Sequence, residues 1–198
     1  MTQALFLTAA YLLGSIPTAV WLSRRLGKDV RTVGSGNAGA TNMLRTFGWK
    51  VGLATFLIDM LKGYAAVQWP IWAGFELSSP WQLALGTAAV IGHIFPIWAR
   101  FRGGKGVATL VGVMLALDPI AAAITLGGVI AVIALSRYVS LGSLVGGLLF
   151  AALYAYFHSS NPTARGIWIL PVIIIITHRE NIRRLLRGQE RKLGEKAG

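Results

Sequence analysis

The sequence has 198 residues, of which 55% are hydrophobic and only 13% charged, and it contains no cysteine. The charged share is about half that of a soluble domain, so most of the chain is expected to face lipid, and the lack of Cys excludes disulfides, a thiolate nucleophile and a Cys-ligated metal. The net charge of +12 would suggest nucleic acid in a soluble protein, but these basic residues lie between apolar runs, which predicts anionic lipids and substrates instead and no nucleic acid partner.

Seven apolar runs are candidates for transmembrane helices, because about 20 apolar residues cross a bilayer and only helices satisfy the backbone there. No basic residue precedes the first run, so we interpret it as a retained span rather than a signal peptide. The fourth and fifth runs meet at Asp118–Pro119 and form either a tight hairpin or one kinked segment. The expected fold is an all-α integral membrane protein in which residues 1–198 form a single polytopic domain. Its spans are predicted at 4–23, 51–73, 81–99, 107–118, 119–136, 141–158 and 166–178.

Positive charge follows alternate connections between these runs. Four segments, at 24–50, 100–106, 137–140 and 179–198, together hold 17 of the 19 Lys and Arg residues. Cytoplasmic loops are enriched in such residues, so we predict an outside N-terminus, a cytoplasmic C-terminus and chemistry at the cytoplasmic face.

The first of these basic segments contains a loop of small and polar residues, GSGNAGATN at 34–42. Such a loop lets backbone N–H groups approach an anion, and Arg45 follows within a turn if a helix begins near Ala40. The loop also matches G-x-G-x-x-G, but no strand precedes it and Asp59 lies in an apolar run, so a dinucleotide fold is not indicated. The alternative is a flexible linker. As a phosphate-binding loop, its expected substrate-binding residues are Ser35, Gly36, Asn37, Thr41, Asn42 and Arg45.

The second basic segment places Lys105 between Gly104 and Gly106, so its amine can approach a ligand without a bulky neighbour. Arg100 and Arg102 nearby either join the site or only hold the loop at lipid headgroups. His93, which precedes this loop, either lines the site or is a structural partner.

The last basic segment begins with His178 and Asn181, which share a face if the helix continues through them. They are predicted to hydrogen-bond a hydroxyl-bearing substrate; the alternative is a plain helix end with a basic tail. Asp59 and Lys62 lie three residues apart within the second apolar run, which predicts a mutual ion pair facing the bundle. No spacing of His, Asp and Glu indicates a metal site.

Three stretches resemble the PlsY family, the acyl-phosphate:glycerol-3-phosphate acyltransferases of bacterial membranes: residues 34–42 with Arg45, residues 92–109 and residues 178–190. The resemblance implies seven helices in the bacterial cytoplasmic (inner) membrane, a site at the cytoplasmic face, and acyl phosphate rather than acyl-CoA or acyl carrier protein as donor. It also implies functional roles for Ser35, Asn37, Arg45, Lys105, Ser143, His178 and Asn181.

The expected reaction is attack of the 1-hydroxyl of glycerol 3-phosphate on the acyl carbonyl, giving lysophosphatidic acid and phosphate, the first step of phospholipid synthesis. No cofactor or metal is expected. We assign catalytic roles to His178, Lys105 and Asn181, and substrate binding to Gly104 and Ser143 besides the first loop; either His178 or the leaving phosphate takes the proton. The alternative function is a small-anion transporter, which should instead place ionisable groups near midplane and on both faces.

Overall fold

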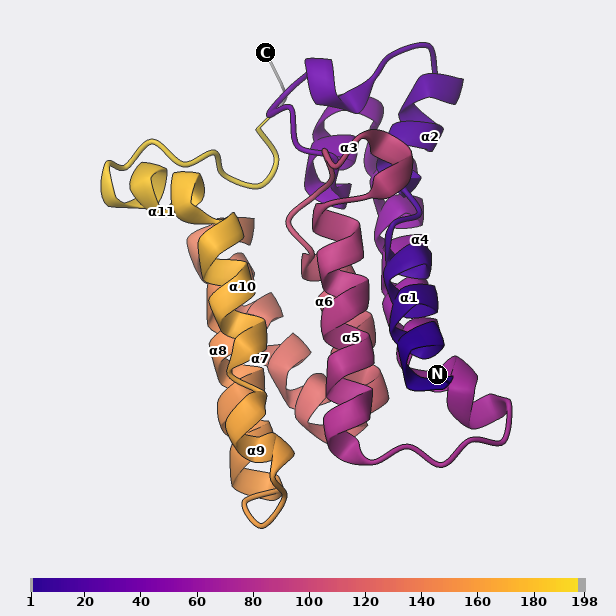
Figure 1. Ribbon diagram of the computed structural model, residues 1–198. Coiled ribbons are helices and arrows are strands. Elements are labelled where there is room, and N and C mark those ends of the chain that lie inside the picture. The colour runs from indigo at the N-terminus through magenta and orange to yellow at the C-terminus, as the bar shows by residue number, and fades with distance from the viewer. Residues whose placement is uncertain (1, 196–198) are drawn as a thin grey trace.

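The computed structural model describes residues 2–195, and this part of the chain is helical with no strand, as predicted (Figure 1). The N-terminal half contains α1 (Thr2–Gly14), α2 (Thr18–Arg25), α3 (Ala40–Phe47), α4 (Trp49–Trp72) and α5 (Ser79–Ile94), with short 3₁₀ turns at Val30–Thr32 and Ile97–Ala99. The C-terminal half contains α6 (Val107–Leu117), α7 (Pro119–Ser136), α8 (Val139–Phe157), α9 (Thr163–Gly166), α10 (Ile169–Thr177) and α11 (Arg179–Leu186).

All seven predicted apolar runs lie largely on helices of this bundle. Four helical segments are long and apolar enough to cross a membrane, namely Gln3–Arg25, Ser79–Ala99, Pro119–Ser136 and Val139–Phe157. The apolar helices Val107–Leu117 and Thr163–Thr177 are shorter. The all-helical class is therefore confirmed, and the number of seven crossings stays a prediction.

The fourth and fifth runs form two separate helices rather than one kinked segment. Asp118 has extended backbone (φ −156°), and its carboxylate accepts hydrogen bonds from the N–H groups of Ile120 and Ala121. Pro119 then occupies the first position of α7, where its missing N–H costs nothing. An N-cap followed by Pro explains why the helix restarts here.

The four basic segments meet at one end of the bundle, which we call the basic end. Arg31 Nη1 donates to the Ala99 carbonyl at 3.1 Å, and Arg45 Nη2 donates to the Arg191 carbonyl at 3.1 Å. In Figure 1 this end is at the top, whereas α1 begins at the bottom. The charge pattern thus predicted correctly which segments lie together, although residues 196–198 of the last segment lie outside the described range. Which side of the membrane holds this end stays a prediction.

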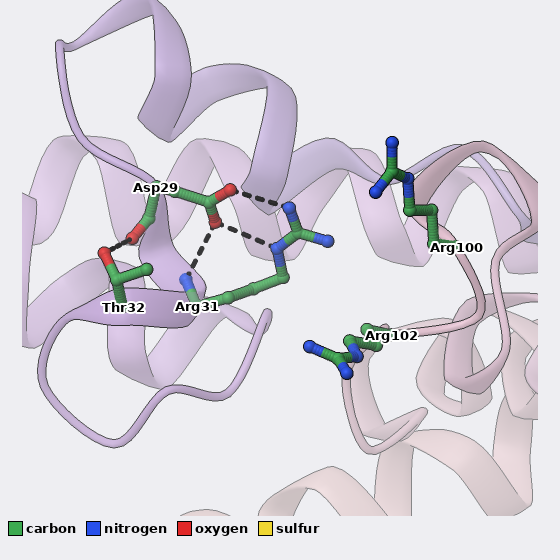
Figure 2. A pocket seen from close by; sticks show the side chains of 5 residues that line it. All are labelled: Asp29, Arg31, Thr32, Arg100 and Arg102. Carbon is green, nitrogen blue, oxygen red and sulfur yellow. Dashed lines mark hydrogen bonds and ion pairs between the residues drawn. The ribbon is translucent and has the colours of Figure 1, made fainter.

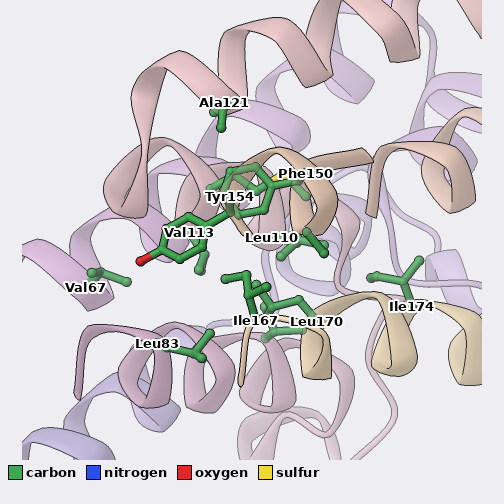
Figure 3. Close-up of a cluster of buried hydrophobic side chains, with 14 of the residues drawn as sticks. Val67, Leu83, Leu110, Val113, Ala121, Phe150, Tyr154, Ile167, Leu170 and Ile174 are labelled. Atoms are coloured by element: carbon green, nitrogen blue, oxygen red, sulfur yellow. The ribbon is translucent and has the colours of Figure 1, made fainter. Parts of the chain in front are cut away.

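The apolar core lies between α4, α5, α6, α7, α8 and α10 (Figure 3). Phe150 and Ile167 are fully buried at its centre. Two glycines let helices α4 and α6 approach closely. A Cβ on Gly63 would lie 2.1 Å from the Thr109 carbonyl oxygen, and a Cβ on Gly112 would lie 1.9 Å from the Met60 carbonyl oxygen. Glycine at such crossings lets membrane helices pack backbone to backbone, which fixes the frame that carries the basic end.

A buried charged pair supports the break between α1 and α2. The Lys62 ammonium lies 2.8 Å from Asp59 Oδ1 and also donates to the Ile16 carbonyl at 2.7 Å. Thr18 Oγ1 donates to the same carboxylate oxygen at 2.8 Å. The predicted ion pair is confirmed, and Lys62 adds a hydrogen bond to the Ile16 carbonyl where the helix breaks before Pro17.

Candidate functional site

The glycine-rich loop at 34–42 is held in shape by Asn42. Its side-chain oxygen accepts from the Ser35 N–H at 3.0 Å, and its amide donates to three carbonyl oxygens, including that of Asn37 at 3.1 Å. The side chain is fully buried. We predicted Asn42 to bind substrate, but the structure uses its polar atoms within the loop.

The rest of this loop is open to a ligand. Ser35 and Gly36 are exposed, and Gly36 has a positive φ of 69°, which glycine adopts without strain. Helix α3 begins at Ala40, as expected, so the loop leads directly into a helix N-terminus. Arg45 on that helix is half-buried, and its Nε–H has no partner among the described residues. The loop therefore has the exposed, glycine-rich backbone that an anion-binding loop needs, and the roles of Ser35, Asn37 and Thr41 stay predictions.

Gly104 joins the first two predicted segments. A Cβ there would lie 2.3 Å from His93 Nε2 and 2.8 Å from the Ala38 carbonyl oxygen. The segment carrying Lys105 is thus packed directly against the glycine-rich loop. His93 is buried against this contact, and its Nδ1 lies 3.6 Å from Asp59 Oδ1. These contacts favour a structural role for His93 over a place in the lining of the site.

Lys105 joins the second segment to the third. Its ammonium donates a hydrogen bond to Asn181 Oδ1, and its carbonyl accepts one from Thr177 Oγ1 at 3.1 Å. Asn181 is buried, and its amide nitrogen donates to Glu190 Oε1 at 2.6 Å. Residues 34–45, 104–105 and 178–181 therefore form one connected region at the basic end.

Glu190 is a residue of this region that the sequence interpretation missed. Its carboxylate also accepts from Arg184 Nε at 2.7 Å and from Ser140 Oγ at 2.8 Å. Burial opposes its ionisation, but the hydrogen bonds from Arg184, Asn181 and Ser140 outweigh burial and hold the pKa of Glu190 below its usual range. A single acidic residue within the basic stretch 183–192 is the signal that would have identified it.

The environment of Lys105 is strongly electropositive. The pKa of Lys105 is lowered to about 8, first by burial of the ammonium and then by the nearby positive charge of Arg184. Arg45 adds to this effect and Glu190 opposes it. Cations from α3, the second loop and α11 therefore lie close enough to influence one another, which suits a ligand with several negative charges.

His178 lies at a break between helices, close to the predicted end of the last apolar span, so the helix does not run unbroken from His178 to Asn181. Helix α10 ends at Thr177 and α11 begins at Arg179, with the buried His178 between them. Its Nδ1 lies 2.9 Å from the Ile174 carbonyl, so Nδ1 carries the hydrogen and Nε2 keeps the lone pair in the neutral ring. Ser143 Oγ instead donates to the Val139 carbonyl of its own helix at 2.9 Å, and its role stays a prediction.

A helical bundle with apolar spans and a cationic region at one end defines an integral membrane protein that handles an anionic substrate. Residues 4–188 match the family model described as glycerol-3-phosphate acyltransferase. The chain is 44% identical over 193 residues to a glycerol-3-phosphate acyltransferase of Geobacter sulfurreducens, covering 97% of this chain and 98% of that one. It is also 44% identical over 196 residues to glycerol-3-phosphate acyltransferase 1 of Deinococcus radiodurans, covering 99% and 98%.

Two solved structures share the fold. Crystal structures of PlsY (YgiH), an integral membrane glycerol 3-phosphate acyltransferase, superimpose with TM-scores of 0.91 for the glycerol 3-phosphate form and 0.85 for the lysophosphatidic acid form. They are 35% and 34% identical to this chain and cover 98% of it and 96% of theirs. The chain therefore belongs to the glycerol-3-phosphate acyltransferase family, which favours the enzyme over the small-anion transporter and confirms the predicted resemblance.

The contact at Gly104 gives a test of how the site is assembled. We expect Gly104→Ala to lower kcat/KM for glycerol 3-phosphate roughly tenfold or more, because the new methyl group forces the Lys105 segment away from His93 and Ala38. Gly127→Ala is the matched control, since a Cβ at Gly127 meets nothing within 4 Å. Equal activity of the two variants would show that this close approach does not position the site.

Proposed function

We propose that the protein transfers a fatty acyl group from acyl phosphate to the 1-hydroxyl of glycerol 3-phosphate at the cytoplasmic face of the bacterial inner membrane. The products are lysophosphatidic acid and inorganic phosphate. The observation that carries the proposal is the convergence of the glycine-rich loop, Arg45, Lys105 and Asn181 at one end of an apolar bundle. The acyl chain of the donor lies between helices or against lipid, while its phosphate meets this region.

The two substrates are both anions, so bringing them together costs Coulomb repulsion. Arg45 and Lys105 offset this repulsion, and those backbone N–H groups at 34–39 that are not bonded within the loop add donors whose strength does not depend on pH. Held in place, the substrate hydroxyl attacks the acyl carbonyl, the bond between that carbon and the phosphate oxygen breaks, and an ester bond forms. Acyl phosphate is already activated, so the reaction needs no covalent enzyme intermediate.

The proton of the attacking hydroxyl has two candidate acceptors. The first is Nε2 of His178, which keeps its lone pair because Nδ1 is bonded to the Ile174 carbonyl. The second is the leaving phosphate itself. Asn181, which bonds Lys105 and Glu190, orients the ammonium toward the substrates in either case.

The deciding experiment supplies purified protein with acyl phosphate and glycerol 3-phosphate. We expect phosphate release equal in amount to the lysophosphatidic acid formed, and no loss of rate when a chelator is present. Acyl-CoA and acyl carrier protein thioesters in parallel assays should give no product. Turnover with a thioester but not with acyl phosphate would contradict the proposed donor while leaving family membership intact.

The lowered pKa of Lys105 predicts a pH dependence. The cationic form binds substrate phosphate, so kcat/KM for glycerol 3-phosphate should fall as pH rises through about 8, the pKa of Lys105 in the free enzyme. Lys105→Arg should move this decline to higher pH, because arginine stays protonated. An unchanged decline in the arginine variant would assign it to another group.

A further inference from the structure

The basic end carries two adjoining hollows that the proposed reaction does not use. One, of about 410 Å³, is lined by Asp29, Arg31, Thr32, Arg100 and Arg102. The other, of about 260 Å³, shares Arg31 and Arg100 and is otherwise lined by Val20, Arg24, Trp98 and Ala99. Neither is lined by Arg45, Lys105, His178 or Asn181, although the larger one adjoins the glycine-rich loop, where a Cβ on Gly36 would lie 3.3 Å from the Arg31 carbonyl oxygen.

The larger hollow is built to hold an anion. Figure 2 shows Asp29 holding the guanidinium of Arg31, with Nε and Nη2 at 2.9 and 2.7 Å from its two carboxylate oxygens. Arg31 Nη1 also donates to the Ala99 carbonyl, which fixes the guanidinium between the two loops. Because Arg31 offers five N–H donors and these bonds use three, donors remain for a ligand.

Arg100 and Arg102 enter the same hollow from the opposite loop. In Figure 2 no bond joins either of them to the other lining residues, and the guanidinium of Arg102 extends toward Arg31. Three arginines against one aspartate leave the lining with a net charge of +2. The forked guanidinium group matches the geometry of a phosphate group.

The surroundings of this site are those of a membrane interface. Trp98 and Phe101 are 59% and 58% exposed, and Trp21 on α2 is 50% exposed. Tryptophan with apolar neighbours is enriched at headgroup depth. The smaller hollow thus places an apolar wall of Val20, Trp98 and Ala99 beside Arg31 and Arg100.

We propose that these hollows bind the phosphate of an anionic glycerophospholipid, with the start of its acyl chains against the Trp98 wall. The apolar wall favours a lipid over a soluble phosphate, which would need only the arginines. A resident lipid here would anchor the loop that leads through Gly103 and Gly104 to Lys105. This inference does not depend on the acyl donor of the enzyme.

The test uses the full chain in neutral detergent and native mass spectrometry. Phosphatidylglycerol and phosphatidylcholine with the same acyl chains are titrated, and their bound fractions are compared. We expect phosphatidylglycerol to bind more tightly than phosphatidylcholine. The double variant Arg100→Gln with Arg102→Gln should bind phosphatidylglycerol about tenfold or more weakly, with its binding of phosphatidylcholine unchanged. The matched control is Arg183→Gln with Arg187→Gln, which removes the same charge from exposed positions of the basic end and should change binding less than about twofold.

Three further arms make the outcome decisive. Trp98→Ala should weaken phosphatidylglycerol, and millimolar inorganic phosphate should not displace it. Displacement by phosphate, or equal losses in the two double variants, would overturn the lipid site in favour of a soluble anion or of general surface charge. If the double Gln variant does not fold, the double Lys variant replaces it; weaker lipid binding at an unchanged melting temperature supports the guanidinium site, and unchanged binding overturns it.

Discussion

Replacing Lys105 by Ala is expected to lower kcat/KM for glycerol 3-phosphate about 100-fold, the scale of one lost preorganised donor at a reacting anion. Lys105 links the second and third segments of the candidate region: Gly104 beside it packs on the glycine-rich loop, and the Lys105 ammonium bonds Asn181. Its loss also leaves the negative charge of Glu190 less balanced. The measurement is initial phosphate release with acyl phosphate and glycerol 3-phosphate at fixed pH.

Lys50→Ala is the matched control for this variant. Lys50 is exposed at the same end of the bundle, where its ammonium lies 5.9 Å from the ring centre of Trp49. The Lys50→Ala variant loses the same charge at a surface position outside the candidate region, so we expect its activity to stay within about twofold of the unchanged protein. If Lys105→Ala behaved like Lys50→Ala, Lys105 would have no part in binding or catalysis.

The sequence allowed much of this site to be predicted, because three clusters of small, polar and basic residues had to share one end of the bundle. Hydrophobic run lengths and the placement of Lys and Arg were sufficient for that inference. The role of Asn42 was not predictable in this way. Asn42 has the same side chain whether it binds substrate or its own loop, and only its four hydrogen bonds reveal the second role.

The last apolar span was predicted to end at His178, and α10 ends one residue earlier, at Thr177. The sequence leaves open whether the helix continues to Asn181, because the stretch from Ile174 to Leu186 contains no Gly or Pro to mark a break. Tertiary hydrogen bonds favour the break between α10 and α11. Asn181 bonds Lys105 and Glu190, and Thr177 bonds the Lys105 carbonyl. Glu190 was missed because its partners come from α8 and α11, which only the folded chain brings together.

Replacing Asp59 by Ala is expected to destabilise the protein by roughly 3–5 kcal/mol, because the variant leaves the ammonium of Lys62 buried without its counter-charge. Both side chains are almost fully buried, at 1% exposure for Asp59 and 4% for Lys62. Thr18 Oγ1 also loses its acceptor. The measurement is thermal unfolding of the protein in detergent, followed by helical circular dichroism.

Two companion variants separate the lost charge pair from other causes. Asp118→Ala removes a carboxylate that caps α7 and lies 2.8 Å from His158, where the side chain is less deeply buried, so a loss of only about 1 kcal/mol is expected. Asp59→Leu combined with Lys62→Met removes both charges, and it should recover most of the stability that Asp59→Ala loses. If the double variant were no more stable than Asp59→Ala, the pair would act through the hydrogen bonds to Thr18 and Ile16 at the helix break, not through charge neutralisation.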